Sequence, residues 1–141
     1  MIQMLGGIDS TASALAAERT RIEVITQNIA NANTTRGIDG KPYQRQHVIF
    51  EAALSQAQAG GVEPHAVTVG RIEPDSRPAR LVYNPGHPDA DKETGMVAMP
   101  DINIHEEMAD MIAASRAFEA NLAVVKNARA MAMQTLSIGK H

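Results

Sequence analysis

The chain has 141 residues and a formal net charge of −3, which suits one small domain and lacks the basic surface of a general nucleic-acid binder. It contains no cysteine, so disulfide bonds, thiolate metal sites and cysteine nucleophiles are excluded. Aromatic residues make up only 3% of the chain, and the apolar share of 44% comes mainly from aliphatic residues and Met. This composition favours helix-on-helix packing over a deep substrate pocket.

Proline and glycine divide the chain into three segments. All seven prolines and seven of the ten glycines fall between residues 37 and 100, whereas residues 8–36 and 101–138 contain neither. Because both residues disfavour helix interiors, we expect an N-terminal helical segment (1–36), a central β or irregular segment (37–100) and a C-terminal helical segment (101–141). The expected fold class is mainly α, with two long terminal helices that form a coiled-coil-like pair.

The first segment carries an apolar residue at every seventh position. These residues are Met1, Ile8, Leu15, Ile22 and Ile29. The spacing predicts a helix over residues 10–33. Asp9, Ser10 or Thr11 would serve as its N-cap, and the Asn/Thr run at 31–35 would end it.

The last segment has a more regular heptad pattern, which predicts a helix over residues 103–138. Asn103 and Glu106 resemble a capping box at its start, and Gly139 lies where a helix stop is expected. Steps of four and three give an apolar seam with polar interruptions at Ser115 and Arg129. The seam comprises Ile104, Met108, Met111, Ser115, Phe118, Leu122, Val125, Arg129, Ala132 and Leu136.

The expected helix lengths indicate an elongated molecule. At about 1.5 Å per residue the two helices measure roughly 36 and 54 Å, whereas a compact domain of this mass is about 30–40 Å across. Part of each seam should therefore remain open for other subunits, although an intramolecular helical hairpin in a monomer is the simpler alternative. The expected assembly interface comprises Leu15, Ile22, Ile29, Met108, Met111, Phe118, Leu122, Val125 and Leu136.

The central segment is expected to contain short strands joined by turns. The candidate strands are residues 43–50, 67–72, 80–83 and 96–99. Asn84-Pro85-Gly86 places Pro and Gly where a type II turn needs them. Residues 52–62 are expected to form a mobile connection.

Candidate chemical sites are weak. His87, Asp89 and Asp91 could contribute ligands to a metal, but a solvated turn explains them better. The acidic residues Asp101, Glu106, Glu107 and Asp110 fit the start of a helix better than a catalytic pair. We therefore expect no catalytic residue, no bound metal or cofactor, no small-molecule substrate and no nucleic-acid partner. The amino terminus has no signal-peptide pattern, and no apolar run is long enough to cross a bilayer.

Four stretches carry a family resemblance. Residues 16–34 (AAERTRIEVITQNIANANT) and 114–122 (ASRAFEANL) resemble the terminal motifs of the bacterial flagellar rod, hook and hook-associated proteins. Residues 40–50 (GKPYQRQHVIF) and 80–91 (RLVYNPGHPDAD) are most similar to a proximal-rod member of that family. Met96 stands where that family has Tyr. The likeness extends over nearly the whole chain.

The resemblance implies a non-enzymatic subunit of the flagellar basal body. Such subunits stack helically into a rod that crosses the periplasm and transmits torque from motor to hook. They leave the cytoplasm through the flagellar type III export apparatus without signal-peptide cleavage, and they assemble with copies of themselves and with other rod proteins. In this family the terminal helices line the inner wall of the tube. A coiled-coil adaptor or a flagellar export chaperone is the alternative.

Overall fold

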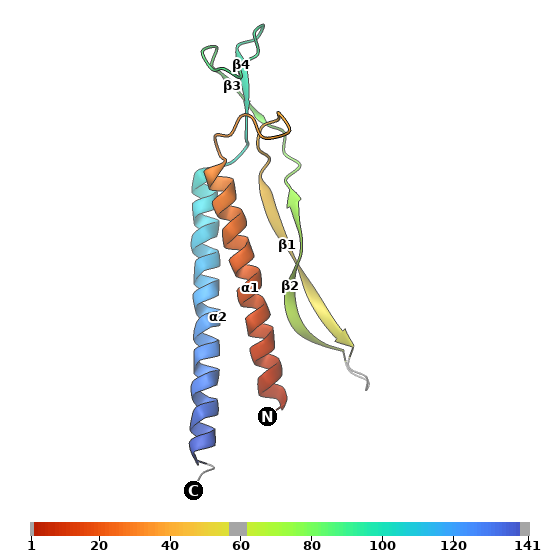
Figure 1. The fold of residues 1–141 in the computed structure, drawn as a ribbon, viewed down its shortest axis with the longest axis vertical. Helices are drawn as coiled ribbons and strands as arrows, with labels where there is room; N and C mark the ends of the chain where they lie inside the picture. Colours follow the sequence, from red (N-terminus) through yellow and green to blue (C-terminus); the bar gives the residue numbers. More distant parts are fainter. Residues whose placement is uncertain (1, 57–61, 139–141) are drawn as a thin grey trace.

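The computed structural model of the chain describes residues 2–56 and 62–138. The two helices run antiparallel, side by side, and the strands form two separate two-stranded ribbons (Figure 1). Both helix ends that bear the chain termini lie at one end of an elongated molecule, and the smaller ribbon lies at the other. The elements are α1 (Ile2–Ala30), β1 (Gln46–Gln56), β2 (Val62–Pro74), β3 (Arg80–Tyr83), β4 (Met96–Met99) and α2 (Ile104–Ile138).

The mainly α class is confirmed, since α1 has 29 residues and α2 has 35. The predicted start of α1 near residue 10 is wrong, because the helix begins at Ile2 and runs through both early glycines. Thr11 does not cap the helix: its hydroxyl donates to the Gly7 carbonyl within the helix, at 2.7 Å. The Ser13 hydroxyl likewise donates to the Ser10 carbonyl, at 2.8 Å. With their oxygens satisfied inside α1, these residues do not interrupt it.

Helix α2 starts where the sequence indicated. The Asn103 side chain accepts a hydrogen bond from the backbone N–H of His105 at 3.1 Å, which satisfies one of the free donors of the first turn. The carbonyl of Asn103 accepts the first helical bond, from Glu107, at 3.0 Å. Asn103 is therefore the N-cap. The stop expected at Gly139 lies outside the described residues.

The ribbon of β1 and β2 is longer than predicted. Its antiparallel register runs from Gln46 opposite Pro74 to Gln56 opposite Val62, so the expected connection at 52–62 is strand at both ends. The remainder of that connection, 57–61, lies outside the described residues. Backbone ladder bonds extend a ribbon regardless of side-chain alternation, which explains why the pattern underestimated it. The register shifts at Gly70, whose bare Cα leaves room for the Glu51 side chain.

The ribbon of β3 and β4 has the predicted strand bounds, with Tyr83 opposite Met96. The predicted turn after β3 is present, because the N–H of His87 donates to the Asn84 carbonyl at 3.1 Å. It is not type II, since Gly86 lacks the positive φ that this type requires. The left-handed residue of this ribbon is Gly95 instead, with a φ of 68°.

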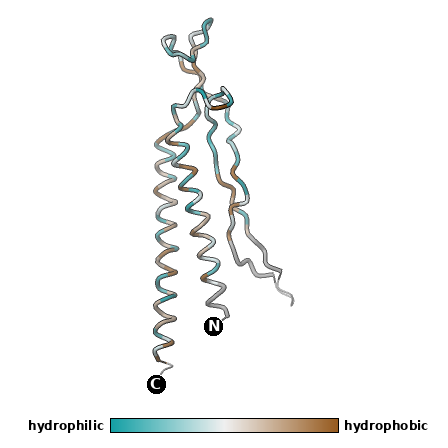
Figure 2. The backbone as a smooth tube through the Cα atoms, in the orientation of Figure 1, coloured by the Kyte–Doolittle hydropathy of each residue, from teal (hydrophilic) through white to brown (hydrophobic). Residues whose placement is uncertain are grey.

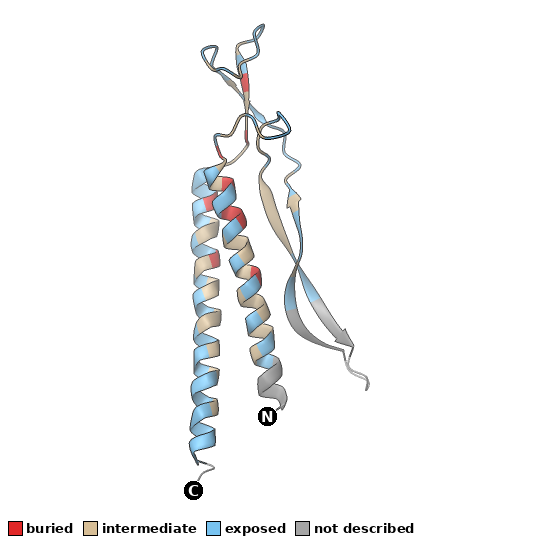
Figure 3. Cartoon of the chain, in the orientation of Figure 1, coloured by how far each residue is buried: buried red, intermediate tan, exposed pale blue. Residues whose placement is uncertain are grey.

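The core is small and lies near the junction of helices and strands. The buried apolar residues are Ala17, Val24, Ile25, Ala32, Val97 and Ala114. Figure 3 shows the buried positions of α2 only in the part toward the smaller ribbon, while the rest of the helix is half-buried or exposed. Figure 2 shows apolar residues continuing along α2 well beyond that buried part. The described chain therefore leaves much of its apolar helical surface uncovered.

Candidate assembly surface

The side of α2 that faces α1 differs from the predicted seam. The buried positions are Glu107 and Ala114, one residue before the predicted Met108 and Ser115. One residue corresponds to about 100° around a helix, so Met108 and Ser115 are turned away from the side of α2 that faces α1. Met108 is accordingly 52% exposed. Helix α1 therefore covers only one edge of the predicted seam on α2.

The nine predicted interface residues divide into two groups. Met108 and Leu136 are exposed, at 52% and 67%. The other seven are half-buried, and they are Leu15, Ile22, Ile29, Met111, Phe118, Leu122 and Val125. Half-burial in one chain leaves apolar area that a neighbouring subunit could cover. Their role in assembly stays a prediction.

Beside the core, a buried polar junction joins α1, α2 and the segment leading into β1. Asn28 and Glu107 are each 1% exposed. The Asn28 amide donates to the Glu107 carboxylate at 3.0 Å and to the Gln46 carbonyl at 2.8 Å. Its carbonyl oxygen accepts from the Gln46 N–H at 2.9 Å and from the Tyr43 hydroxyl at 3.1 Å. All four hydrogen-bonding positions of one amide are thus used, which fixes the relative placement of three segments.

Arg45 supplies the charge that balances the buried carboxylate. Its Nε donates to Glu107 at 2.6 Å, a charge-assisted bond. Its terminal nitrogens lie 3.6 Å from Asp75 and 3.7 Å from Asp110, so the end of β2 joins the same cluster. Burial of the phenol and the nearby charge of Glu107 raise the pKa of Tyr43. We name the set Asn28, Tyr43, Arg45, Gln46 and Glu107 the polar junction.

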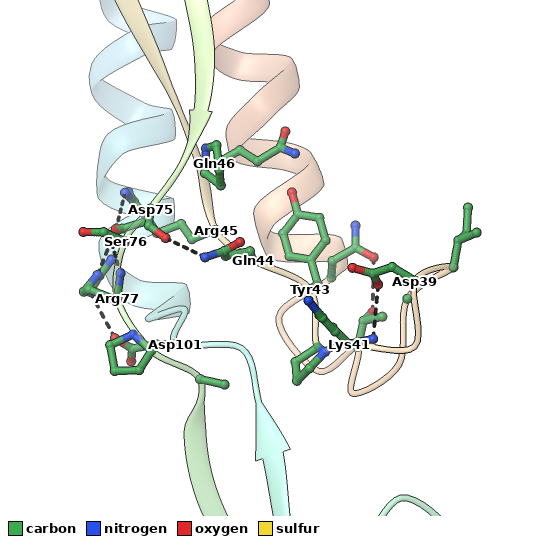
Figure 4. A pocket seen from close by; sticks show the side chains of 18 residues that line it. Asp39, Lys41, Tyr43, Gln44, Arg45, Gln46, Asp75, Ser76, Arg77 and Asp101 are labelled. Atoms are coloured by element: carbon green, nitrogen blue, oxygen red, sulfur yellow. Dashed lines mark hydrogen bonds and ion pairs between the residues drawn. The ribbon is translucent and has the colours of Figure 1, made fainter.

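Ion pairs continue from the polar junction toward the smaller ribbon. Arg77 lies 2.9 Å from Asp75 and 3.4 Å from Asp101, as Figure 4 shows. The backbone N–H and guanidinium of Arg77 hold the pKa of Asp75 below its usual value. These residues and the 37–46 loop line an open groove between the two ribbons. Hydrogen bonds and ion pairs join five of its lining residues, Gln44, Arg45, Asp75, Arg77 and Asp101, so in this groove they act as structural cross-links.

In the turn after β3, the candidate metal ligands Asp89 and Asp91 have structural partners. Asp89 accepts from the Thr35 hydroxyl at 2.8 Å and lies 3.6 Å from Arg36. Asp91 accepts from the backbone N–H groups of Glu93 and Thr94, which lower its pKa. Within residues 2–56 and 62–138, no group of three or more acidic or histidine side chains is arranged to hold a metal ion. Asp89 therefore ties this turn to the segment that follows α1, and Asp91 stabilises the turn itself.

Sequence reasoning missed the polar junction. The sequence pattern predicts charges at a helix start for Asp101, Glu106, Glu107 and Asp110, yet Glu107 alone of the four is fully buried. The available signal was Asn28, a polar residue four positions after Val24 and therefore on the same face of α1 as an apolar core residue. That signal identifies a buried amide but not its partner 79 residues away.

No helix in the described part of the chain combines the length and hydrophobicity needed to span a bilayer. The chain thus has two long antiparallel helices, a partly open apolar surface and a paired polar junction. These features define a structural subunit of an elongated assembly.

Comparison with known proteins identifies the assembly. Residues 8–36 match the family model for flagella basal body rod proteins, and residues 93–138 match that for the C-terminal part of flagellar basal body rod FlgEFG proteins. The chain is 40% identical to the flagellar basal-body rod protein FlgC of Borreliella burgdorferi, over 96% of this chain and 97% of that protein. It is 37% identical to FlgC of Yersinia enterocolitica, covering 99% and 100%, and 36% identical to FlgC of Bacillus subtilis, covering 94% and 96%.

The chain belongs to the flagellar basal-body rod protein family, and the three relatives just described are FlgC proteins. The family is structural, so the chain is a rod subunit of the basal body and not an enzyme. The first match covers most of α1, and the second covers β4 and the whole of α2.

Proposed function

We propose that this chain is a subunit of the proximal part of the rod, where it packs with copies of itself and with other rod proteins. The observation that carries the proposal is the partly covered helix pair on a chain that belongs to the rod family. A monomeric hairpin would be expected to bury the apolar residues of α2, whereas Met131, Met133 and Leu136 are 55%, 62% and 67% exposed. The helices are suited to a coiled-coil-like packing that neighbouring subunits complete.

The polar junction supports a mechanical role. It cross-links both helices and the segment entering β1 through one fully bonded amide and one buried ion pair. A subunit that transmits torque needs its helical and ribbon parts to move as one body, and such links resist bending at the joint. The division into segments 1–36, 37–100 and 101–141 then corresponds to two helices for packing and a ribbon region for contacts with neighbours.

The same proposal includes the route to the rod. We infer that the chain passes through the flagellar type III export apparatus without a cleaved signal peptide and that its rod crosses the periplasm. A narrow channel requires an unfolded chain, which suits helices whose apolar faces are completed only on assembly.

Fractionation tests the proposal directly. Basal bodies purified from cells that produce this chain should contain it, with an intact amino terminus by mass spectrometry. A coiled-coil adaptor or an export chaperone would instead remain with the cytoplasmic fraction. Absence from purified basal bodies would refute the rod assignment, and a shortened amino terminus would refute the export route alone.

A further inference from the structure

The segment between α1 and β1 contains an aspartate followed directly by glycine. Asp39-Gly40 is the one such pair in the sequence, and no asparagine precedes a glycine. Both residues are exposed. Attack of the next backbone nitrogen on an aspartate carboxyl closes a five-membered succinimide ring, and a Cβ on that next residue hinders the approach. Asp39 therefore has the neighbour that hinders this reaction least.

Residues 37–41 form a short closed loop. The Gly37 N–H donates to the Lys41 carbonyl at 2.7 Å, and the Gly40 N–H donates to the Gly37 carbonyl at 3.0 Å. Gly40 has a φ of 75°, the left-handed conformation that ends a three-residue loop of this kind. These bonds are short-range, so the loop can open without disturbing the helices or the ribbons.

The Asp39 carboxylate is folded back over this loop. Its Oδ1 accepts a hydrogen bond from the Lys41 N–H at 3.1 Å, as Figure 4 shows. The same oxygen lies 3.1 Å from the position that a Cβ on Gly37 would occupy. A side chain bonded to the N–H two residues ahead spans the peptide between them. The carboxyl carbon is thus a neighbour of the Gly40 nitrogen, and release of the Gly40 bond with rotation of this peptide brings the two atoms together.

The other aspartates are held more firmly. Asp75, Asp89 and Asp101 form ion pairs with arginines, at 2.9, 3.6 and 3.4 Å. Hydrogen bonds from backbone N–H groups lower the pKa of Asp75 and of Asp91, so their carboxyls less often carry the proton with which an oxygen leaves as water. The two aspartates inside α1 and α2 each precede an N–H that is bonded within the helix.

We propose that Asp39 is a site of spontaneous isomerisation to isoaspartate. The Gly40 nitrogen loses its proton and attacks the Asp39 carboxyl carbon, and the carboxyl OH leaves with a proton as water. Water then opens the succinimide at one of its two carbonyls. Opening at the former side-chain carbonyl restores aspartate, and opening at the main-chain carbonyl gives isoaspartate. One water is released and one is taken up, so no oxidant, reductant or cofactor takes part. The modification is independent of the proposed function.

Isoaspartate changes the loop and leaves the helix pair intact. The main chain then runs through the Cβ and the carboxyl carbon of Asp39, so one extra carbon enters the closed loop. The Tyr43 N–H donates to the Thr34 carbonyl at 3.0 Å, and this bond separates the loop from the polar junction. The loop lines one side of the groove between the two ribbons. The modification therefore reshapes that wall of the groove without unfolding the chain.

Peptide mapping of the aged full-length chain tests the site. Purified chain is held at neutral pH, and isoaspartate is located by electron-transfer fragmentation, which cleaves the extra backbone bond of this residue. Asp39 should convert at least tenfold faster than Asp75 or Asp89. Circular dichroism of the aged chain should show unchanged helix content.

Two substitutions of the same exposed residue serve as controls. Asp39→Glu keeps the charge but requires a six-membered ring, so conversion at this position should cease. Asp39→Asn should react several-fold faster and give the same two products, because a neutral amide is attacked more readily than a carboxylate and ammonia leaves in place of water.

The inference is overturned if Asp39 stays unmodified in the folded chain but converts in urea, because the loop would then protect it. Conversion of another aspartate first in the folded chain would also overturn it. So would an isoaspartate yield that Asp39→Glu leaves unchanged.

Discussion

Asn28 on α1 and Glu107 on α2 are hydrogen-bonded at 3.0 Å, and both side chains are 1% exposed. A buried carboxylate requires a compensating partner, and Arg45 supplies it at 2.6 Å. A shift of α2 along α1 by one turn would separate these groups and leave the carboxylate unpaired. The polar junction therefore sets the register of the helix pair. The apolar residues of the interface are largely small, and alone they would specify that register less strongly.

Glu107→Ala should strongly destabilise the isolated chain. The change leaves the Nε–H of Arg45 and one N–H of Asn28 without their partner, and breaking a buried pair in this way costs about 3 kcal/mol. Urea unfolding followed by circular dichroism measures the effect. The neighbouring Glu106→Ala, at an exposed position, should change the free energy of unfolding by less than about 0.5 kcal/mol. Equal effects of the two substitutions would contradict a special role for the junction.

Tyr43 should ionise at a higher pH than an ordinary tyrosine. Burial and the charge of Glu107 raise its pKa above the usual value of 10.0. The folded chain then holds the phenol proton more tightly than the unfolded chain does. The contribution of Tyr43 to folding stability is therefore present below the pKa of the unfolded chain and is lost as pH rises through the pKa of the folded chain. Phenolate absorbance in a Tyr83→Phe background isolates this group, and the titration in urea provides the unfolded reference. A folded pKa at or below the urea value would be evidence against this account.

Gly95→Ala should destabilise the smaller ribbon. The residue has a φ of 68°, and an added Cβ would lie 2.9 Å from Cε2 of Tyr83. Left-handed strain alone costs about 1–2 kcal/mol, and the contact adds to it. Gly7→Ala is the matched control, because this glycine is in α1 with nothing within 4 Å of an added Cβ. It should stabilise the chain by about 0.5–1 kcal/mol. Thermal unfolding of both variants gives the comparison, and the same sign for both would contradict it.

Phe118→Asp should weaken the helix pair and block assembly. The half-buried ring is replaced by a charge beside α1, at a cost of about 2 kcal/mol for a partly buried site. Leu122→Asp should act in the same way. Val124→Asp, at a position 54% exposed, should change the stability of the isolated chain by less than about 0.5 kcal/mol. Unfolding curves measure the first effect, and rods counted by electron microscopy measure the second. Wild-type rods in the Phe118→Asp strain would show that the predicted interface is misplaced.

Local patterns predicted those parts of the fold that local interactions determine. The bounds of β3, β4 and α2 agree closely with the structure, because Pro and Gly delimit the strands and Asn103 caps the helix. The predicted start of α1 is wrong because Thr11, which resembles a cap, bonds to a carbonyl within the helix. The sequence pattern underestimates the length of the ribbon of β1 and β2 because ladder bonds do not depend on a side-chain pattern.

The candidate site was less predictable for a different reason. A heptad repeat identifies an apolar side of α2 but not which edge α1 covers. That edge depends on Glu107, whose partners Asn28 and Arg45 lie 79 and 62 residues away in the sequence. A charge near the start of a helix is usually solvated, so no local rule distinguishes Glu107 from Glu106. The family resemblance indicated the function, whereas the junction emerged only from the three-dimensional arrangement.

The central claim is that this chain is a structural subunit of the flagellar rod, and one measurement tests it most directly. Electron microscopy of basal bodies from a strain that lacks only this gene should show truncated or missing rods in cells that do not swim. Resupply of the wild-type gene should restore both rods and swimming. Intact rods in swimming cells that lack the gene would contradict the claim.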